Sequence, residues 1–339
     1  MTSPSRVGVG VIGLGFMGQT HIRSYAQWPE RCRLVAVCDR NAHRLVGNTG
    51  AQGNIDADRA MAPMFDPDSM VAYHDADEIL RDPQVDLVSI CTPTDTHVAL
   101  AARAMEAGKH VLVEKPIATR SDEVVPLIEQ QGQTSRHCQP AMCMRFWPGW
   151  SWLKDAIDRQ AYGPVLSARF ERLGGRPGWG EGFYQDDDRS GGALFDLHVH
   201  DVDMIRWLFG PPAALHARGD TSHVATAYRY GGGPSMVSAV GGWLPGGDVP
   251  FRMRYIVTFE HATAEFNSQA ERPLTLTFEG RTEPITIESG DGYQYQARAV
   301  VDAIRGERAI TPTLDEALEV TRLLEAERES LRQNGPIEL

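Results

Sequence analysis

A glycine-rich stretch near the start of the chain restricts the fold more than any other feature of the sequence. The stretch RVGVGVIGLGFMGQTH contains the spacing G-x-G-x-x-G in two overlapping registers. The first register uses Gly8, Gly10 and Gly13, and the second uses Gly13, Gly15 and Gly18. This spacing lets a backbone turn sharply and present N–H groups to an anion, but it also occurs in ordinary glycine-rich turns. The surrounding residues must decide between these two interpretations.

Only the second register fits a dinucleotide-binding loop. Such a loop needs a buried strand before the first glycine, a helix after the last glycine and an acidic residue about 20 positions further on. The residues TSPSRV before Gly8 contain a proline and two serines and leave no room for a buried strand. Before Gly13 an apolar run predicts a strand, Gln19–Gln27 predicts a helix, and Asp39 closes the next apolar run. We therefore predict a dinucleotide pyrophosphate on Gly13, Gly15, Phe16, Met17 and Gly18.

The residue that closes the second predicted strand indicates which dinucleotide is bound. The Asp39 carboxylate can accept hydrogen bonds from ribose hydroxyls and would repel a 2′-phosphate, so it favours NAD over NADP. Arg40, the next residue, could pair with such a phosphate, and NADP therefore stays open. The loop by itself is compatible with a nicotinamide or a flavin dinucleotide. We predict that Asp39 and Arg40 border the adenosine ribose.

The first part of the chain alternates buried strands with helices. The apolar runs that predict strands are Val7–Ile12, Leu34–Cys38, Val85–Cys91 and His110–Val113. A crossover helix is predicted over His97–Ala107, with Gly108 as its stop signal. This alternation predicts an α/β fold, a doubly wound parallel sheet of the Rossmann type, over residues 1–140. The stretch Gly47–Tyr73 is long for a connection in such a sheet and is interpreted as an extended loop or lid.

The second part of the chain has a different pattern. From Val165 to about Ile287, alternating apolar and polar residues separated by glycine-rich turns predict a large, open, mainly antiparallel sheet. Thr313 and Glu316 form a capping box that predicts a C-terminal helix over residues 313–333. We assign residues 141–339 to an α+β domain for substrate binding and oligomerisation. A chain of 339 residues suits two domains.

Polar groups follow two of the predicted parallel strands. Thr92, Pro93 and His97 follow one strand, and Glu114 and Lys115 follow the next along the chain. Taken alone, E-K-P is typical of a surface ion pair before a turn. Ligands of such sheets bind at the carboxyl ends of the strands, however, so all five residues are predicted to face the cofactor crevice.

A third cluster lies in SGGALFDLHVHDVDMIRWLFG, which is rich in His and Asp. If this segment is helical, Asp196 and His200 share one face, which suits proton transfer. His198 and His200 would then point to nearly opposite sides, whereas a two-histidine metal site needs them together. No metal site is predicted, although a solvated helix face remains an alternative interpretation of this cluster.

Composition excludes several classes of function. The net charge of −12 opposes binding to nucleic acid and to anionic membranes. No apolar run is long enough for a membrane span, and the first residues lack the apolar core of a secretory signal, so the cytoplasm is expected. The five cysteines show no C-x-x-C pair, so neither a disulfide framework nor a zinc site is indicated. A small-molecule ligand is favoured.

Together these motifs resemble the Gfo/Idh/MocA oxidoreductase family, named for glucose-fructose oxidoreductase, inositol dehydrogenase and rhizopine catabolism. The pattern of that family is G-x-G-x-x-G, an acidic end to the second strand, T-P…H, E-K-P and a later G-G-x-x-x-D-x-x-x-H. The chain carries it, in this order, at Gly13/Gly15/Gly18, Asp39, Thr92-Pro93 with His97, Glu114-Lys115-Pro116, and Gly191-Gly192 with Asp196 and His200.

The resemblance implies roles for these residues and an assembly. It implies that Lys115 and His200 are the polar pair at a reacting hydroxyl and that Asp196 supports His200. It also implies a homodimer or homotetramer, because the open sheet of the family commonly forms the subunit contact. The Gly47–Tyr73 insertion is longer than usual and His198 replaces a frequent glycine, so both could reshape the substrate pocket.

We therefore expect an NAD(P)-dependent oxidoreductase that transfers a hydride between a secondary alcohol of a sugar or polyol and a nicotinamide cofactor. NAD is the expected cofactor, and NADP is not excluded. One alternative is a glycoside hydrolase or lyase that oxidises its sugar transiently and recycles bound NAD. The other alternative, a cofactor-binding module without catalysis, is disfavoured because both Lys115 and His200 are retained.

Overall fold

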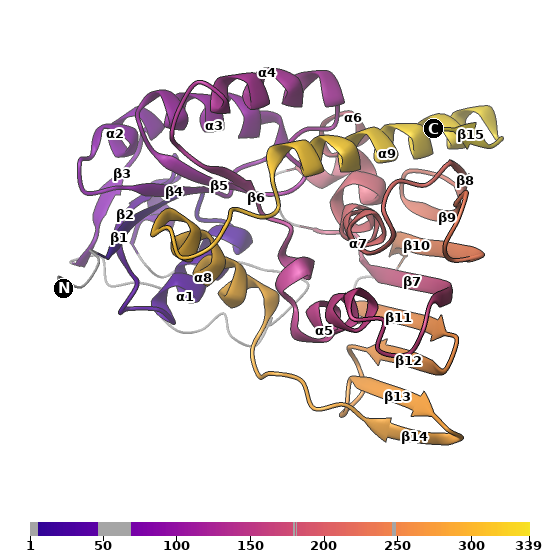
Figure 1. Cartoon of the computed structure of the whole chain (residues 1–339). Coiled ribbons are helices and arrows are strands. Elements are labelled where there is room, and N and C mark those ends of the chain that lie inside the picture. Colours follow the sequence, from indigo (N-terminus) through magenta and orange to yellow (C-terminus); the bar gives the residue numbers. More distant parts are fainter. Residues whose placement is uncertain (1–5, 47–68, 179, 181, 246–248) are drawn as a thin grey trace. The chain divides into compact units, whose positions relative to one another are not determined.

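The computed structural model describes residues 6–46, 69–178, 180, 182–245 and 249–339, which form two compact units (Figure 1). Both units are discontinuous in sequence. The first unit is formed by Met1–Cys143, Trp179–Glu181 and Asp291–Leu318, and the second by Met144–Gly178, Gly182–Gly290 and Glu319–Leu339. None of the helices in the described ranges combines the length and apolar character that crossing a bilayer requires.

The first unit contains a six-stranded parallel sheet in the order β3-β2-β1-β4-β5-β6. Its strands are β1 (Val7–Ile12), β2 (Cys32–Cys38), β3 (Val71–Tyr73), β4 (Leu87–Ile90), β5 (His110–Val113) and β6 (Cys138–Pro140). Its helices are α1 (Phe16–Ala26), α2 (Ala76–Arg81), α3 (His97–Glu106), α4 (Ser121–Gln131) and α8 (Gly292–Ile304). Helices α2, α3 and α4 lie along one face of the sheet, and α1 and α8 lie along the other (Figure 1). The predicted doubly wound Rossmann fold is confirmed.

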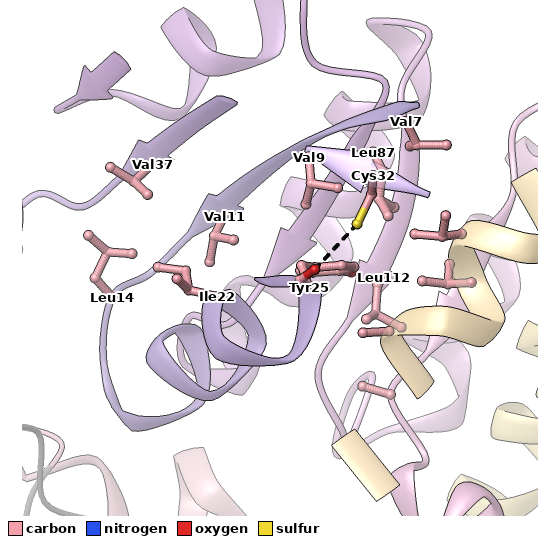
Figure 2. Close-up of a cluster of buried hydrophobic side chains, with 14 of the residues drawn as sticks. Val7, Val9, Val11, Leu14, Ile22, Tyr25, Cys32, Val37, Leu87 and Leu112 are labelled. Carbon is pink, nitrogen blue, oxygen red and sulfur yellow. Dashed lines mark hydrogen bonds between the residues drawn. The ribbon is translucent and has the colours of Figure 1, made fainter. Parts of the chain in front are cut away.

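The core of the first unit explains why α8 belongs to it. Figure 2 shows the side chains of Val9 and Val11 on β1 beside those of Ile22 and Tyr25 on α1. The same buried cluster includes alanine and valine side chains of α8, namely Ala297, Val300 and Val301. The sequence-based division placed all residues beyond 140 in the second domain, whereas the contacts group α8 with the first unit. The apolar face of this helix is buried against α1, which is distant in sequence.

The second unit contains a nine-stranded sheet in the order β14-β13-β12-β11-β7-β10-β9-β8-β15. The strands are β7 (Val165–Gly175), β8 (Ala214–Gly219), β9 (His223–Arg229), β10 (Met236–Leu244), β11 (Arg252–Phe259), β12 (Ala262–Asn267), β13 (Leu274–Phe278), β14 (Arg281–Pro284) and β15 (Ile337–Glu338). Only β7 and β10 are parallel neighbours, and the other paired strands are antiparallel. The helices α5 (Pro148–Asp158) and α7 (Val199–Phe209) lie along one face of this sheet (Figure 1). The predicted open, mainly antiparallel sheet is confirmed.

The structure also tests the predicted capping box and part of the predicted Gly47–Tyr73 loop. The capping box of helix α9 (Leu314–Gln333) is present, because Glu316 N donates to Thr313 Oγ1 at 3.2 Å and Thr313 N donates to the Glu316 carboxylate at 2.8 Å. Of the interpreted Gly47–Tyr73 loop, residues 47–68 lie outside the described residues. Its last three residues form strand β3, which pairs with β2, so that part of the loop interpretation is wrong. A short apolar edge strand of this kind gives too little pattern to be distinguished from a loop.

The structure predicts acid lability from His110, the first residue of β5. Burial, with the neighbouring His137 and Arg136, lowers the pKa of His110 to about 4. A histidine in an unfolded chain has a pKa near 6.5. Between that pH and about pH 4 the unfolded chain is therefore protonated at His110 while the folded chain is not. The folded state is therefore expected to lose about 2 kcal/mol of stability from His110 between pH 7.5 and pH 5.

Urea unfolding at these two pH values checks this expectation. His110→Gln should reduce the pH dependence by that amount, and His261→Gln, at an exposed histidine of the second unit, should leave it unchanged. An identical pH dependence in wild type and His110→Gln would contradict the assignment.

Candidate active site

The carboxyl ends of the central strands in the first unit place most of the predicted cofactor residues at one edge of the sheet. Gly13 follows β1, Asp39 follows β2, Thr92 lies beyond β4 and Glu114 follows β5. The sheet order makes these four strands consecutive, β2-β1-β4-β5. The chain proceeds outward in opposite directions from β1 and β4, so the boundary between these strands is the switch point at which such sheets bind ligands.

The glycine loop has the backbone geometry that a dinucleotide requires. Gly13 has a φ of +88°, and a Cβ at Gly18 would lie 1.9 Å from Gly13 O, so both positions need glycine for the loop itself. A Cβ built at Gly15 meets no atom of the described part of the chain within 4 Å. Gly15 is the N-cap of α1, and Phe16 and Met17 begin its first turn, whose N–H groups have no partner within a helix. The open space at Gly15 therefore fits a pyrophosphate held by a helix N-terminus.

Substituting Gly15 separates cofactor binding from folding. Gly15→Ala is expected to weaken NADH binding by about tenfold or more, because the methyl group fills the space of the ligand. The urea midpoint should stay close to that of the wild type, since the backbone at Gly15 is ordinary, with φ −68°. Fluorescence titration with NADH measures the affinity, and an unchanged affinity would place the pyrophosphate elsewhere.

Asp39 is tied to the glycine loop. Its Oδ2 accepts a hydrogen bond from Leu14 N at 2.7 Å, and its Oδ1 accepts one from Asn41 N at 2.8 Å. The carboxylate is buried, while the neighbouring Arg40 is exposed, and Arg44 lies 3.5 Å from Asp39 Oδ2. Asp39 thus holds a negative charge at the end of β2 beside the loop, where a 2′-phosphate would be repelled.

The two loops beyond β4 and β5 are linked by one buried imidazole. His97 Nδ1 lies 2.8 Å from Pro116 O, and His97 Nε2 lies 2.8 Å from Thr92 O. Burial lowers the pKa of His97. The sequence prediction placed His97 at the cofactor, and the structure shows it joining the loop of Thr92 and Pro93 to the loop of Lys115.

Glu114 is directed into the first unit. Its Oε1 lies 2.9 Å from His21 Nε2, and its Oε2 accepts a hydrogen bond from Lys115 N at 3.1 Å. Burial alone would raise the pKa of Glu114, but the hydrogen bond from His21, with the charge of Lys115, holds this pKa below its ordinary value. The contact of Glu114 with the cofactor stays a prediction. The partner His21, in the second turn of α1, was missed because a histidine within a helix carries no signal of its own.

The Asp- and His-rich cluster lies within the second unit. Residues Leu194–His198 form a π-helical turn that leads directly into α7, so the segment is helical as predicted. Asp196 lies in the π turn, and the buried His200 lies in the first turn of α7. π turns occur frequently at functional sites. The pairing of Asp196 with His200 stays a prediction.

Buried ion pairs hold the helix that carries His200. Asp201, the next residue, accepts hydrogen bonds from Arg172 of β7 at 3.0 and 3.2 Å. Asp203, two residues after Asp201 and therefore on another side of the helix, is bound by Arg145 at 2.7 to 3.2 Å. All four side chains are at most 2% exposed. These pairs determine the rotation of α7 and with it the placement of His200.

His198 has a structural partner that the sequence analysis did not identify. Its Nε2 lies 3.0 Å from Glu327 of α9, and the Tyr228 hydroxyl also donates to Glu327. Burial opposes the imidazolium, yet the Glu327 charge raises the pKa of His198 above its ordinary value. A Cβ at Gly241 of β10 would lie 2.6 Å from the ring, so the glycine provides the room for it. A glutamate within the apolar stripe of α9 was the available signal. Among the described residues, no group of three or more His, Cys, Asp or Glu side chains is placed to hold a metal ion.

Models of protein families match both parts of the chain. Residues 7–141 match a model described as an oxidoreductase family with an NAD-binding Rossmann fold. Residues 150–279 match a model described as the GFO/IDH/MocA C-terminal domain.

Three relatives are similar to the chain over part of their length. A levoglucosan dehydrogenase of Pseudarthrobacter phenanthrenivorans is 27% identical over 292 residues, 83% of this chain and 70% of the relative. A scyllo-inositol 2-dehydrogenase (NAD(+)) of Bacillus subtilis is 29% identical over 209 residues, 60% of this chain and 54% of the relative. An uncharacterised oxidoreductase of Rhizobium meliloti is 35% identical over 177 residues, 51% of this chain and 52% of the relative. The chain thus spans about half the length of the last two.

Solved structures share the fold. A levoglucosan dehydrogenase in complex with NADH superposes with a TM-score of 0.82 at 22% identity, covering 98% of this chain and 99% of the other. GenD2 from gentamicin A biosynthesis, in complex with NAD, has a TM-score of 0.80 at 24% identity, covering 100% of this chain and 98% of the other. At these identities the likeness concerns the fold.

Proposed function

This chain belongs to the Gfo/Idh/MocA oxidoreductase family, and from that premise we propose that it is an NAD-dependent dehydrogenase acting on a secondary alcohol of a sugar or polyol. One observation carries the proposal: the chain keeps Lys115 after β5 and His200 at the start of α7, the two polar positions of the family motifs. The named relatives that act on levoglucosan and scyllo-inositol support a cyclic polyhydroxylated substrate.

The cofactor site fits a nicotinamide dinucleotide. Gly13, Gly15, Phe16, Met17 and Gly18 would hold the pyrophosphate, and the open space at Gly15 is the observation that supports this. Asp39 and Arg40 would border the adenosine ribose, and Thr92, Pro93, His97 and Glu114 would line or support the nicotinamide end, as the motif match implies. The nicotinamide supplies the hydride acceptor for the reaction.

Side chains of the protein would accept the proton of the substrate hydroxyl and stabilise the negative charge that develops on its oxygen. His200 Nε2 removes the proton of the substrate hydroxyl as the C–H bond breaks. The ammonium group of Lys115 stabilises the negative charge that develops on that oxygen. Asp196 holds the orientation and the tautomer of the His200 imidazole. These are the roles that the family motifs imply for Lys115 and His200.

A panel of sugars and polyols, read by NADH absorbance with NAD and NADP side by side, tests the proposal. Net NADH formation with a cyclic polyol, and a preference for NAD, are expected because Asp39 is negative. Sugar release without net NADH would favour the hydrolase or lyase alternative, which the oxidoreductase relatives do not support. Tight NADH binding without turnover of any substrate would indicate a cofactor-binding module instead.

We further propose that the nine-stranded sheet forms the contact of a homodimer or homotetramer. Support comes from the face opposite to α5, where, among the described residues, Ile256 in the middle of β11 is 37% exposed. Light scattering after gel filtration should give two or four times the mass of the chain, and Ile256→Glu should shift it toward the monomer. A monomeric wild type would contradict the proposal. The cytoplasmic location, and the expectation that no nucleic acid or membrane is a partner, stay predictions.

A further inference from the structure

A chain of buried polar side chains ends at the backbone of Lys115. The Tyr25 hydroxyl lies 2.8 Å from Ser89 Oγ, which lies 3.2 Å from His21 Nδ1. His21 Nε2 lies 2.9 Å from Glu114 Oε1, and the other carboxylate oxygen accepts a hydrogen bond from Lys115 N. The four side chains are at most 7% exposed and come from α1, β4 and the end of β5.

The chemistry of the groups determines which atom carries each proton. The Glu114 carboxylate can only accept hydrogen bonds, because its pKa is held low. His21 therefore donates from Nε2, and in the Nε2–H tautomer its Nδ1 accepts from the Ser89 hydroxyl. Ser89 Oγ in turn accepts from Tyr25, whose phenol stays protonated because burial raises its pKa. In this arrangement each of the four side chains has a hydrogen-bond partner within the chain.

We propose that His21 and Glu114 are positioning residues that fix Lys115 relative to the dinucleotide helix. The inference rests on the proposed role of Lys115 at the substrate hydroxyl. Helix α1 begins at the glycine loop, and His21 on that helix binds one oxygen of Glu114, while the backbone of Lys115 binds the other. One carboxylate therefore joins the cofactor helix to the lysine loop. Through this carboxylate Glu114 acts on the position of Lys115.

His97 supports the same loop from its other side. The imidazole lies between Pro116 O and Thr92 O. A neutral ring donates a hydrogen bond to one of these two carbonyls and packs against the other, so it still lies between the residue after Lys115 and the loop beyond β4. The segment 114–116 is thus bound before and after Lys115 through two histidines on different helices. The backbone of Lys115 is therefore held by contacts of the residue before it and of the residue after it.

Kinetics of two variants test the positioning role. Glu114→Gln keeps the shape of the side chain but removes the charge, and is expected to lower kcat by about tenfold while the Kd for NADH changes by less than about threefold. The basic limb of its pH profile should also move to lower pH by about one unit, because the Lys115 ammonium loses a neighbouring anion. The other titratable groups near Glu114 are retained in this variant, namely His21, His97 and the buried thiol Cys91.

A second variant checks the donor. His21→Leu should lower kcat by about tenfold, whereas His21→Gln, which keeps a donor at a similar distance, should stay within about threefold of the wild type. The matched control is His137→Gln. His137 precedes β6, at the amino ends of the strands and away from Lys115, so this variant should leave kcat unchanged. Equal losses in the His21 variants, or an affinity loss in Glu114→Gln without a change in kcat, would overturn the inference.

The tautomer of the His21 ring can be measured without an activity assay, and it tests the chain of hydrogen bonds directly. In the cofactor-free protein, ¹⁵N shifts of the His21 ring, assigned by comparison with His21→Gln, should show a neutral ring protonated at Nε2. A ring protonated at Nδ1, or at both nitrogens, would contradict the chain of hydrogen bonds. Lys115→Met separates the two claims: if it retains wild-type turnover, the proposed function of Lys115 fails. If it is inactive while both Glu114→Gln and His21→Leu behave as wild type, only the positioning inference fails.

Discussion

Replacing Lys115 with methionine is expected to lower kcat by roughly 10³-fold, and replacing His200 with alanine by roughly 10²-fold or more. The first change removes the positive charge at the developing oxyanion, and the second removes the proton acceptor. Neither residue belongs to the glycine loop, so the Kd for NADH should change by less than about threefold. Steady-state assays with the best substrate of the panel and fluorescence titration with NADH measure the two quantities.

The two variants should also be non-additive when combined. If Lys115 and His200 act on one hydroxyl, the double variant should lose little more than the worse single variant. Lys154→Met is the control and should keep wild-type turnover, because this half-buried lysine pairs with Asp158 and lies over the ring of Trp207 at the far end of α7 from His200. Wild-type kcat in either single variant would remove that residue from the proposed mechanism.

Replacing Asp201 with asparagine is expected to cost about 3–5 kcal/mol of folding stability. Asp201 is fully buried and binds the guanidinium of Arg172, which is 1% exposed. An arginine cannot release its proton to escape burial, so the variant leaves an uncompensated cation in the core of the second unit. Urea unfolding monitored by fluorescence of the buried Trp150, over whose ring Arg172 lies, measures the loss.

An exposed pair of the same type provides the comparison. Arg254 and Glu265 lie 3.3 Å apart on β11 and β12 with side chains 40% and 46% exposed. Glu265→Gln should cost less than about 1 kcal/mol, because water solvates the remaining charge. If Asp201→Asn were as mild as Glu265→Gln, the buried pair would not be what holds α7 on the sheet.

The helices and strands that the sequence predicted are those whose pattern lies within a few consecutive residues. Strands β1 and β5 lie where continuous apolar runs placed them, and α3 begins at the expected residue, His97. The second glycine register is the loop because a strand must precede it, and Gly8 and Gly10 are strand residues that pack against their neighbours. Burial on both faces of a parallel sheet leaves a pattern in consecutive residues, and this pattern needs no knowledge of the rest of the fold.

Partners distant in sequence were not predictable in the same way. The sequence placed Glu114 and His97 at the cofactor edge from their positions after strands, which was enough to locate the loops but not to orient the side chains. In the structure the Glu114 side chain contacts His21, 93 residues away. His97 lies between the loop beyond β4 and the loop beyond β5. Which way a side chain turns depends on the shape of the packed core around it.

By itself the sequence determined the parallel sheet, the glycine loop, the acidic end of β2 and the helix caps, because backbone sterics and the alternation of buried residues act over a few neighbours. Only the tertiary structure decided that α8 packs in the first unit, that His198 binds Glu327, and that Glu114 joins His21 to Lys115. Each of these arises when segments far apart in the chain are packed together, and a buried charge then binds the partner that the packing provides.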